Sequence, residues 1–136
     1  MIQRIQTVYL AVAAIALAIL LFSDAVHGSG PPARWGTLLL GIPAWGGAVA
    51  AIFMYKDRHR QRRLIVAAQV STILAVVVLY ASLFIQGALS VRTMAGVDVM
   101  RLVELMLPLA AYLCLLLARR GVTRDIRLVE SMDRIR

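Results

Sequence analysis

Four long apolar runs, separated by short polar stretches, dominate the chain. They cover residues 7–22, 37–55, 64–89 and 102–118. A helix needs about 20 residues to span a bilayer, with a range of about 17–25. The first run reaches that length if its helix begins near Ile5, and the third is long enough to tilt or to leave the bilayer near Gln86. The pattern predicts an all-α integral membrane four-helix bundle over residues 1–118, with spans at about 5–22, 37–55, 64–87 and 102–118.

The last segment, residues 119–136, has a different pattern. After Gly121, which can end a helix, apolar residues recur at spacings of four and three, which is one face of a helix. They are Val122, Ile126, Val129, Met132 and Ile135. Charged residues flank this face. We therefore predict a separate C-terminal amphipathic cytoplasmic helix, which either lies on the membrane surface or docks on a protein partner.

Composition supports a membrane protein. The 136 residues are 61% hydrophobic, with a mean hydropathy of +0.81, whereas soluble domains are about 45–50% apolar. The single cysteine, Cys114, lies in an apolar run, so neither an internal disulfide nor a CxxC redox motif exists. The first run also has features of a cleaved signal peptide, but it is long for one.

The basic residues are unevenly distributed, and the densest cluster is "KDRHRQRR" at 56–63. Five of the 15 basic residues lie there, six more follow from Arg119 onward, and Arg4 precedes the first run. With four spans, these segments share one side of the membrane. Short cytoplasmic loops carry such an excess. We predict a multi-pass protein of the bacterial inner membrane with both termini cytoplasmic. The cluster would then be the turn of the second hairpin, in contact with lipid headgroups; nucleic-acid binding lacks interleaved aromatic residues.

Glu104 is the acidic residue inside the fourth run, and such residues are candidates for proton or cation transport. It lies near the start of that run, and Arg101 is three residues earlier on the same helical face. An intramembrane ion pair between Glu104 and Arg101 is the simpler interpretation. Polar residues of the third run, among them Gln69 and Thr72, either hydrogen-bond between helices or line a polar path.

Catalytic chemistry has little support in the sequence. His27 and His59 fall on opposite sides of the predicted membrane and cannot share a metal. No HExxH, GxSxG or phosphate-binding loop is present. Asp24 and His27 share a flexible loop without a framed nucleophile. We expect no enzyme activity, no cofactor, no metal and no nucleic-acid partner.

Both ends of the chain, "MIQRIQTVYL" and "LARRGVTRDIRLVESMDRIR", resemble the ends of a family of small bacterial four-span membrane proteins, a domain-of-unknown-function family. The matching positions are Gln3, Arg4, Gln6, Thr7, Tyr9, Arg119, Arg120, Asp125, Leu128, Val129, Asp133, Arg134 and Arg136. Ile126 stands where the family leads us to expect an acidic residue. The resemblance implies four inner-membrane helices and brings no activity, substrate or catalytic residue.

The matching ends lie on the same predicted side, so Gln3, Arg4 or Gln6 is expected to contact Asp125 or Asp133. Our first hypothesis is a non-enzymatic accessory or assembly subunit that binds a protein partner, and membrane lipids, through a basic cytoplasmic face. Candidate residues of that face are Arg4, Lys56, Arg58, Arg60, Arg62, Arg63, Arg119, Arg120, Asp125, Asp133 and Arg134. The alternative is a small oligomeric transporter or channel that uses Glu104 and the polar residues of the third span.

Overall fold

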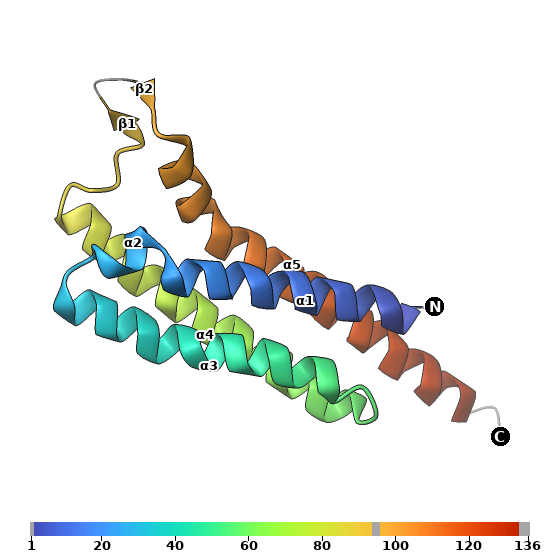
Figure 1. Cartoon of the computed structure of the whole chain (residues 1–136). Coiled ribbons are helices and arrows are strands. Elements are labelled where there is room, and N and C mark those ends of the chain that lie inside the picture. The colour runs from blue at the N-terminus through green and yellow to red at the C-terminus, as the bar shows by residue number, and fades with distance from the viewer. Residues whose placement is uncertain (1, 94–95, 134–136) are drawn as a thin grey trace.

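The computed structural model describes residues 2–93 and 96–133, with side chains over 5–91 and 96–132. Four long helices and one very short helix account for most of the chain, and a small hairpin joins the last two long helices (Figure 1). The elements are α1 (Ile2–Phe22), α2 (Asp24–His27), α3 (Pro31–Phe53), α4 (Arg58–Ile85), β1 (Arg92–Thr93), β2 (Gly96–Val97) and α5 (Val99–Asp133).

The long helices run up and down and close into a ring. α1 packs on α3 and α5, and α4 packs on the same two helices. The start of α1, the α3–α4 turn and the end of α5 therefore lie at one end of the bundle (Figure 1). We call this the basic end and define it as residues 2–9, 54–63 and 119–133. The short helix α2 and the β hairpin lie at the opposite end, the hairpin end.

The predicted fold class is confirmed. Four helices are long and apolar enough to cross a membrane: Ile5–Phe22, Pro31–Phe53, Arg58–Ile85 and Val99–Met132. Side chains that face out of the bundle are large and apolar, as lipid contact requires. On α1 they recur at helical spacing as Val8, Val12, Ile15 and Ile19.

The interior of the bundle is built largely from small residues. Ala13, Ala48 and Ala118 are fully buried near the basic end, and Ala44 and Ala111 are fully buried farther along the bundle. Small residues let membrane helices approach closely, because close packing and not hydrophobic contrast with lipid drives their association. Larger core residues occur in both regions. Leu10, Ile65 and Leu115 are buried near the basic end, and Leu20, Val26, Leu79, Leu83 and Leu105 are buried near the hairpin end.

The second long helix begins several residues before the predicted span. Residues 23–36, between the first two predicted spans, contain α2 and the start of α3 at Pro31. Pro31 and Pro32 occupy the first positions of α3. Proline suits this place because a first-turn N–H has no partner within the helix and the fixed φ of proline is already helical.

The boundary between the fourth span and a separate tail helix is also wrong. α5 continues without a break from Val99 to Asp133 and passes through Gly121. The described glycines with positive φ are Gly30, Gly87 and Gly96, so Gly121 does not form a left-handed helix cap. Val122 and Ile126, predicted to lie on a free amphipathic face, are buried in the core at the basic end. The tail is therefore the last part of the bundle.

The connection between α4 and α5 contains a β hairpin that the sequence did not predict. β1 and β2 pair antiparallel, with Arg92 opposite Val97 and Thr93 opposite Gly96. Gly96 has φ 128°, a conformation that side chains with a Cβ rarely adopt. Asp98 then accepts a hydrogen bond from the backbone N–H of Arg101 at 3.1 Å, as an N-cap of α5 does.

A candidate interaction surface at the basic end

A buried hydrogen bond ties the first helix to the last. The Nε2 atom of Gln6 on α1 donates to Oδ2 of Asp125 on α5 at 2.8 Å, and both side chains are buried. This contact is among those expected from the sequence, and it is confirmed for this pair. The side chains of Gln3, Arg4 and Asp133 lie outside the described residues. A buried carboxylate needs such a donor, because burial without one costs several kcal/mol.

Gly121 makes room for this hydrogen bond. A Cβ at position 121 would lie 2.8 Å from Cγ and 3.0 Å from Nε2 of Gln6. Such distances are shorter than van der Waals contact, so a larger residue at 121 would displace Gln6. The helix α5 continues beyond Gly121. The glycine therefore allows close packing against Gln6 and does not end the helix.

The α3–α4 turn is held by two local contacts. Asp57 caps α4 by accepting a hydrogen bond from the Arg60 backbone N–H at 3.1 Å, and its carboxylate lies 3.0 Å from the Arg60 Nε atom. Buried Gln61 donates to the carbonyl of Ala51 at 3.0 Å, which joins the start of α4 to the end of α3. Because α4 begins at Arg58, most of the basic cluster is helical rather than a turn as predicted.

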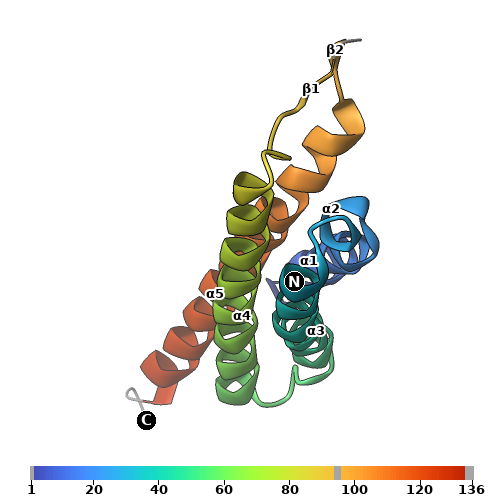
Figure 2. The same cartoon turned by 90° about the vertical axis from the view of Figure 1, so that its left-hand side faces the viewer.

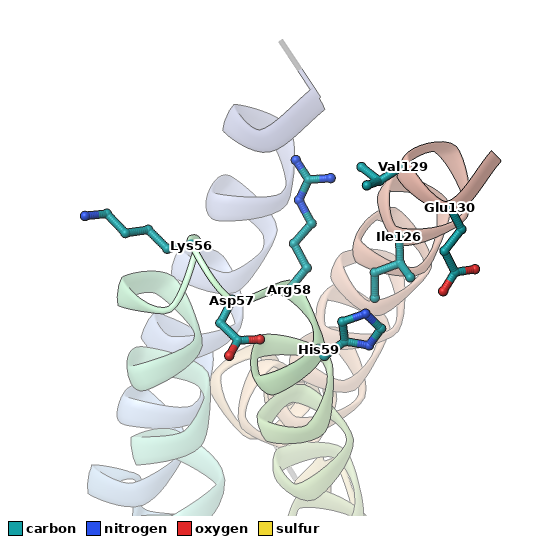
Figure 3. Close-up of a pocket in the computed structure, with 7 residues that line it drawn as sticks. All are labelled: Lys56, Asp57, Arg58, His59, Ile126, Val129 and Glu130. Carbon is teal, nitrogen blue, oxygen red and sulfur yellow. The ribbon is translucent and has the colours of Figure 1, made fainter. Parts of the chain in front are cut away.

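An open hollow of about 620 Å³ lies between this turn and the last turns of α5. We call it the docking groove. Its lining residues are Lys56, Asp57, Arg58, His59, Ile126, Val129 and Glu130 (Figure 3). The α5 side contributes apolar Ile126 and Val129, and the α4 side contributes mainly charge. Arg58 also reaches α5, where Nη1 lies 3.4 Å from the carbonyl oxygen of Asp125. The groove thus combines an apolar wall with a mainly cationic one.

The structure gathers the described candidate surface residues at this end. Lys56, Arg60, Arg62 and Arg63 are exposed, as are Arg119 and Arg120, whereas Arg58 is half-buried and Asp125 is buried. Arg119 reaches back across to α4, where Nη1 lies 3.4 Å from Oε1 of Gln69. The side chains of the candidates Arg4, Asp133 and Arg134 lie outside the described residues. Asp125 therefore joins helices inside this surface and does not form part of its exposed face.

The predicted ion pair between Arg101 and Glu104 is absent. Among the described side chains, the ion pair that forms is Arg60 with Asp57. Nη2 of Arg101 instead donates to the carbonyl oxygen of Ala88 at 2.7 Å. The spacing of three residues permits the pair, but the chain between α4 and α5 supplies a backbone acceptor to Arg101. Arg101 therefore holds in place the segment that leads from α4 to the hairpin.

Because Arg101 bonds a backbone carbonyl and not Glu104, replacing the two residues is expected to change stability by different amounts. Arg101→Gln is expected to lower the free energy of unfolding by about 1 kcal/mol, because a hydrogen bond from a charged group is lost. Glu104→Gln is expected to change it by less than about 0.5 kcal/mol. Equilibrium unfolding in detergent measures both. A large equal loss for the two variants would restore the ion-pair interpretation.

Several polar groups that could line a transport path are satisfied within the protein. The Thr72 hydroxyl donates to the Ala68 carbonyl and the Ser82 hydroxyl to the Leu79 carbonyl, both at 2.7 Å. Gln86 donates through Nε2 to the Ser29 carbonyl. In the described part of the chain, Nε2 of buried Gln69 has no hydrogen-bond partner. The polar residues of α4 therefore give no specific support to the transporter hypothesis.

The two histidines lie far apart, as predicted. His27 ends α2 at the hairpin end, whereas His59 is in the first turn of α4 at the basic end (Figure 1). Among the described residues, no three His, Cys, Asp or Glu side chains gather as a metal site would require.

Comparison with known families places the chain. A family model described as "Domain of unknown function (DUF4293)" matches residues 28–135, well over half of the chain. The chain belongs to the DUF4293 family. No curated protein and no solved structure matched. The DUF4293 match includes α3, α4, all of α5 and the C-terminal residues of the predicted resemblance except Arg136. The N-terminal residues of that resemblance, Gln6 among them, lie outside the matched range.

Sequence reasoning missed two features of the DUF4293 domain that shape this surface. One is the buried role of Gln61, which looked like part of a solvated cluster. Its signal was its position four residues before buried Ile65 and eight before buried Gln69, on one helical face. The other is the position of the groove itself, because it depends on how α5 is rotated against α4 and the sequence pattern does not contain that angle.

Proposed function

We propose that this protein is a non-enzymatic membrane protein, an accessory or assembly subunit that binds a protein partner through its basic end. The observation that supports this most is the exposed apolar surface on the last turns of α5. Leu128, Val129 and Met132 are 49%, 40% and 62% exposed, beside the docking groove. Figure 2 shows these turns diverging from α4. Exposed apolar residues rimmed by charge are typical of interaction sites.

The chemistry of the docking groove favours an amphipathic helix with acidic residues as the partner segment. Ile126 and Val129 offer an apolar wall for such a helix. Arg58 extends from the start of α4 toward that wall, whereas the Lys56 side chain points away from α5 (Figure 3). The nearest acidic group on that side, Asp57, is already used by Arg60. Glu130 on α5 lines the same groove and offsets one of the two positive charges of Lys56 and Arg58. The positive charge that remains is available to acidic side chains of the partner, and it would steer association and fix the register of the partner.

The charge distribution supports an orientation for this proposal. Ten of the 15 basic residues lie in the segments that define the basic end, and Arg134 and Arg136 follow them in the sequence. By the positive-inside rule, the proposed protein lies in the bacterial inner membrane with this end and both termini in the cytoplasm. The partner would then be a cytoplasmic segment, or the cytoplasmic part of another membrane protein.

A photo-crosslinking experiment in native membranes tests the proposal. A photoreactive amino acid replaces Val129 in one variant and Val97 in another. Val97 is the control because it is also exposed but lies on β2 at the hairpin end. The expected result is one protein crosslinked from position 129, identified by mass spectrometry and absent from position 97.

A negative charge placed in the groove completes this test. In this variant the crosslinker is at position 132 and Val129→Glu is added beside it. The crosslinked product is expected to fall about tenfold or more, because the added carboxylate repels an acidic partner. Val97→Glu should leave the product unchanged. Equal crosslinking patterns from both ends, or a folded protein that yields only lipid adducts from position 129, would contradict a protein partner.

A further inference from the structure

A second surface at the basic end lies beside the docking groove and shares His59 with it. Two open hollows of about 520 and 580 Å³ lie between α4 and α5, and Arg62 and Arg119 line both. Because they share these two residues, we treat them as one site and call it the arginine groove. Its six arginines are Arg62, Arg63, Arg119, Arg120, Arg124 and Arg127.

Helical spacing explains why these arginines gather. Arg62 and Arg63 follow His59 by three and four residues, so they form one stripe on α4. Positions 116, 119, 120, 123, 124 and 127 form a matching stripe on α5. In the part of the chain that the structure describes, no acidic side chain lines either hollow. The positive charge of the groove is therefore not neutralised by its own lining.

The nearby acidic groups are used elsewhere. Asp57 contacts Arg60, which does not line the groove, and Asp125 accepts from Gln6 inside the bundle. Arg119 is held toward α4 by its contact with Oε1 of Gln69 at 3.4 Å. Gln69 is 4% exposed, and its Nε2 atom has no partner among the described residues. The groove therefore has a positioned cation, Arg119, whose guanidinium is held by a buried residue behind the lining.

The groove is basic in one part and apolar in the other. The rest of its lining is His59, Val66 and Ala67 of α4 and Leu116 and Thr123 of α5. Toward the middle of the bundle the same two helices continue with Val70 and Leu113, which are 51% and 59% exposed. A soluble anion would use only the arginines. A phospholipid would use both parts, with its phosphate on the arginines and its acyl chains along the apolar surface.

We propose that the arginine groove is a binding site for an anionic phospholipid, best filled by one whose headgroup has two phosphates. Arg62 and Arg119 line both hollows, so they would bind between the two phosphates. Arg63 lines only the smaller hollow, and Arg120, Arg124 and Arg127 line only the larger one. Guanidinium groups bind phosphate by paired, charge-assisted hydrogen bonds. Basic pockets between membrane helices near the headgroup level recognise such lipids. The site goes beyond the proposed function and does not depend on a protein partner.

Native mass spectrometry of the detergent-purified protein tests this site. The full chain is titrated with cardiolipin, which has two phosphates, with phosphatidylglycerol, which has one, and with zwitterionic phosphatidylcholine. We expect cardiolipin to bind at least about tenfold more tightly than phosphatidylglycerol, and phosphatidylcholine not to be retained. Arg62→Gln combined with Arg119→Gln should weaken cardiolipin binding about 30-fold, as expected for two arginines near a headgroup.

A charge-matched control separates the groove from general attraction. Lys56→Gln combined with Arg60→Gln removes the same charge at the same end, but neither residue lines the arginine groove. This variant should bind cardiolipin within about threefold of the parent protein. An equal loss in both double variants would overturn the proposal, because it would show attraction by overall charge alone.

Arg119 also contacts Gln69, so its replacement could affect packing as well as lipid binding. A second double variant therefore leaves Arg119 in place. Arg124→Gln combined with Arg127→Gln changes only the hollow lined by α5 residues and Arg62. It should weaken cardiolipin binding while leaving phosphatidylglycerol binding unchanged. Inorganic phosphate is the competing ligand in a separate titration. Displacement of cardiolipin by millimolar phosphate would assign the site to a soluble anion and overturn the lipid proposal, as would equal binding of all three lipids.

Discussion

Asp125→Ala is expected to lower the free energy of unfolding by about 1–3 kcal/mol, because it leaves the buried amide of Gln6 without an acceptor. Reversible unfolding in detergent micelles, followed by circular dichroism, measures this change. The main-chain carbonyl of Asp125 that Arg58 approaches is unaffected by the substitution. The loss therefore reports on the bond between α1 and α5.

A double-mutant cycle isolates this bond. Removing both partners, in Gln6→Ala with Asp125→Ala, should cost less than the two single losses added together, because no buried polar group is then left unpaired. Glu130→Ala is the control on the same helix, since Glu130 is exposed, and should change stability by less than about 0.5 kcal/mol. Additive losses in the cycle would show that Gln6 and Asp125 do not depend on each other.

Gly47→Leu is expected to destabilise the bundle by about 1–3 kcal/mol, whereas Gly46→Leu is expected to be neutral or slightly stabilising. A Cβ at position 47 would lie 3.3 Å from the Cβ of Ala68 and 3.6 Å from the carbonyl oxygen of Leu64. A leucine there would push α3 away from α4. A Cβ at position 46 would meet no atom of the described residues within 4 Å.

The two adjacent glycines give a closely matched pair for this measurement. Both variants make the same chemical change in the same helix, so helix propensity and hydrophobicity cancel in the comparison. Thermal unfolding of each in detergent gives the difference directly. If Gly46→Leu were the more damaging variant, the face of α3 that contains Gly46 would be packed against a partner in the detergent-solubilised protein.

The apolar runs predicted the four helices because lipid leaves the chain few choices. Every backbone polar group in a spanning segment must be satisfied within that segment, so a long apolar run must be helical. The hydrogen bond between Gln6 and Asp125 could also be anticipated, because two polar residues at matching ends had to share one side. The prolines at the start of α3 were harder to interpret, since Pro31 and Pro32 fit both a loop and a helix start.

Other features of the surface depend on contacts that the sequence does not contain. Gly121 looked like a stop signal, but its neighbour Gln6 is 115 residues away and shows that the glycine serves packing. The spacing of Arg101 and Glu104 allowed an ion pair, yet the carbonyl of Ala88 is the acceptor that Arg101 uses. The arginine groove depends on the rotation of two helices, so composition could indicate its charge but not its shape.

The hydrogen bond between Gln6 and Asp125 has a consequence for biosynthesis. Its partners are 119 residues apart, so nearly the whole chain must be made before the ring of helices can close. Until then α1 lacks its neighbour α5, and the polar amide of Gln6 has no carboxylate. Contacts of such long range form late in folding. A nascent chain that stops short of Asp125 would leave α1 open to other membrane helices, and insertion factors or membrane proteases would be able to recognise it.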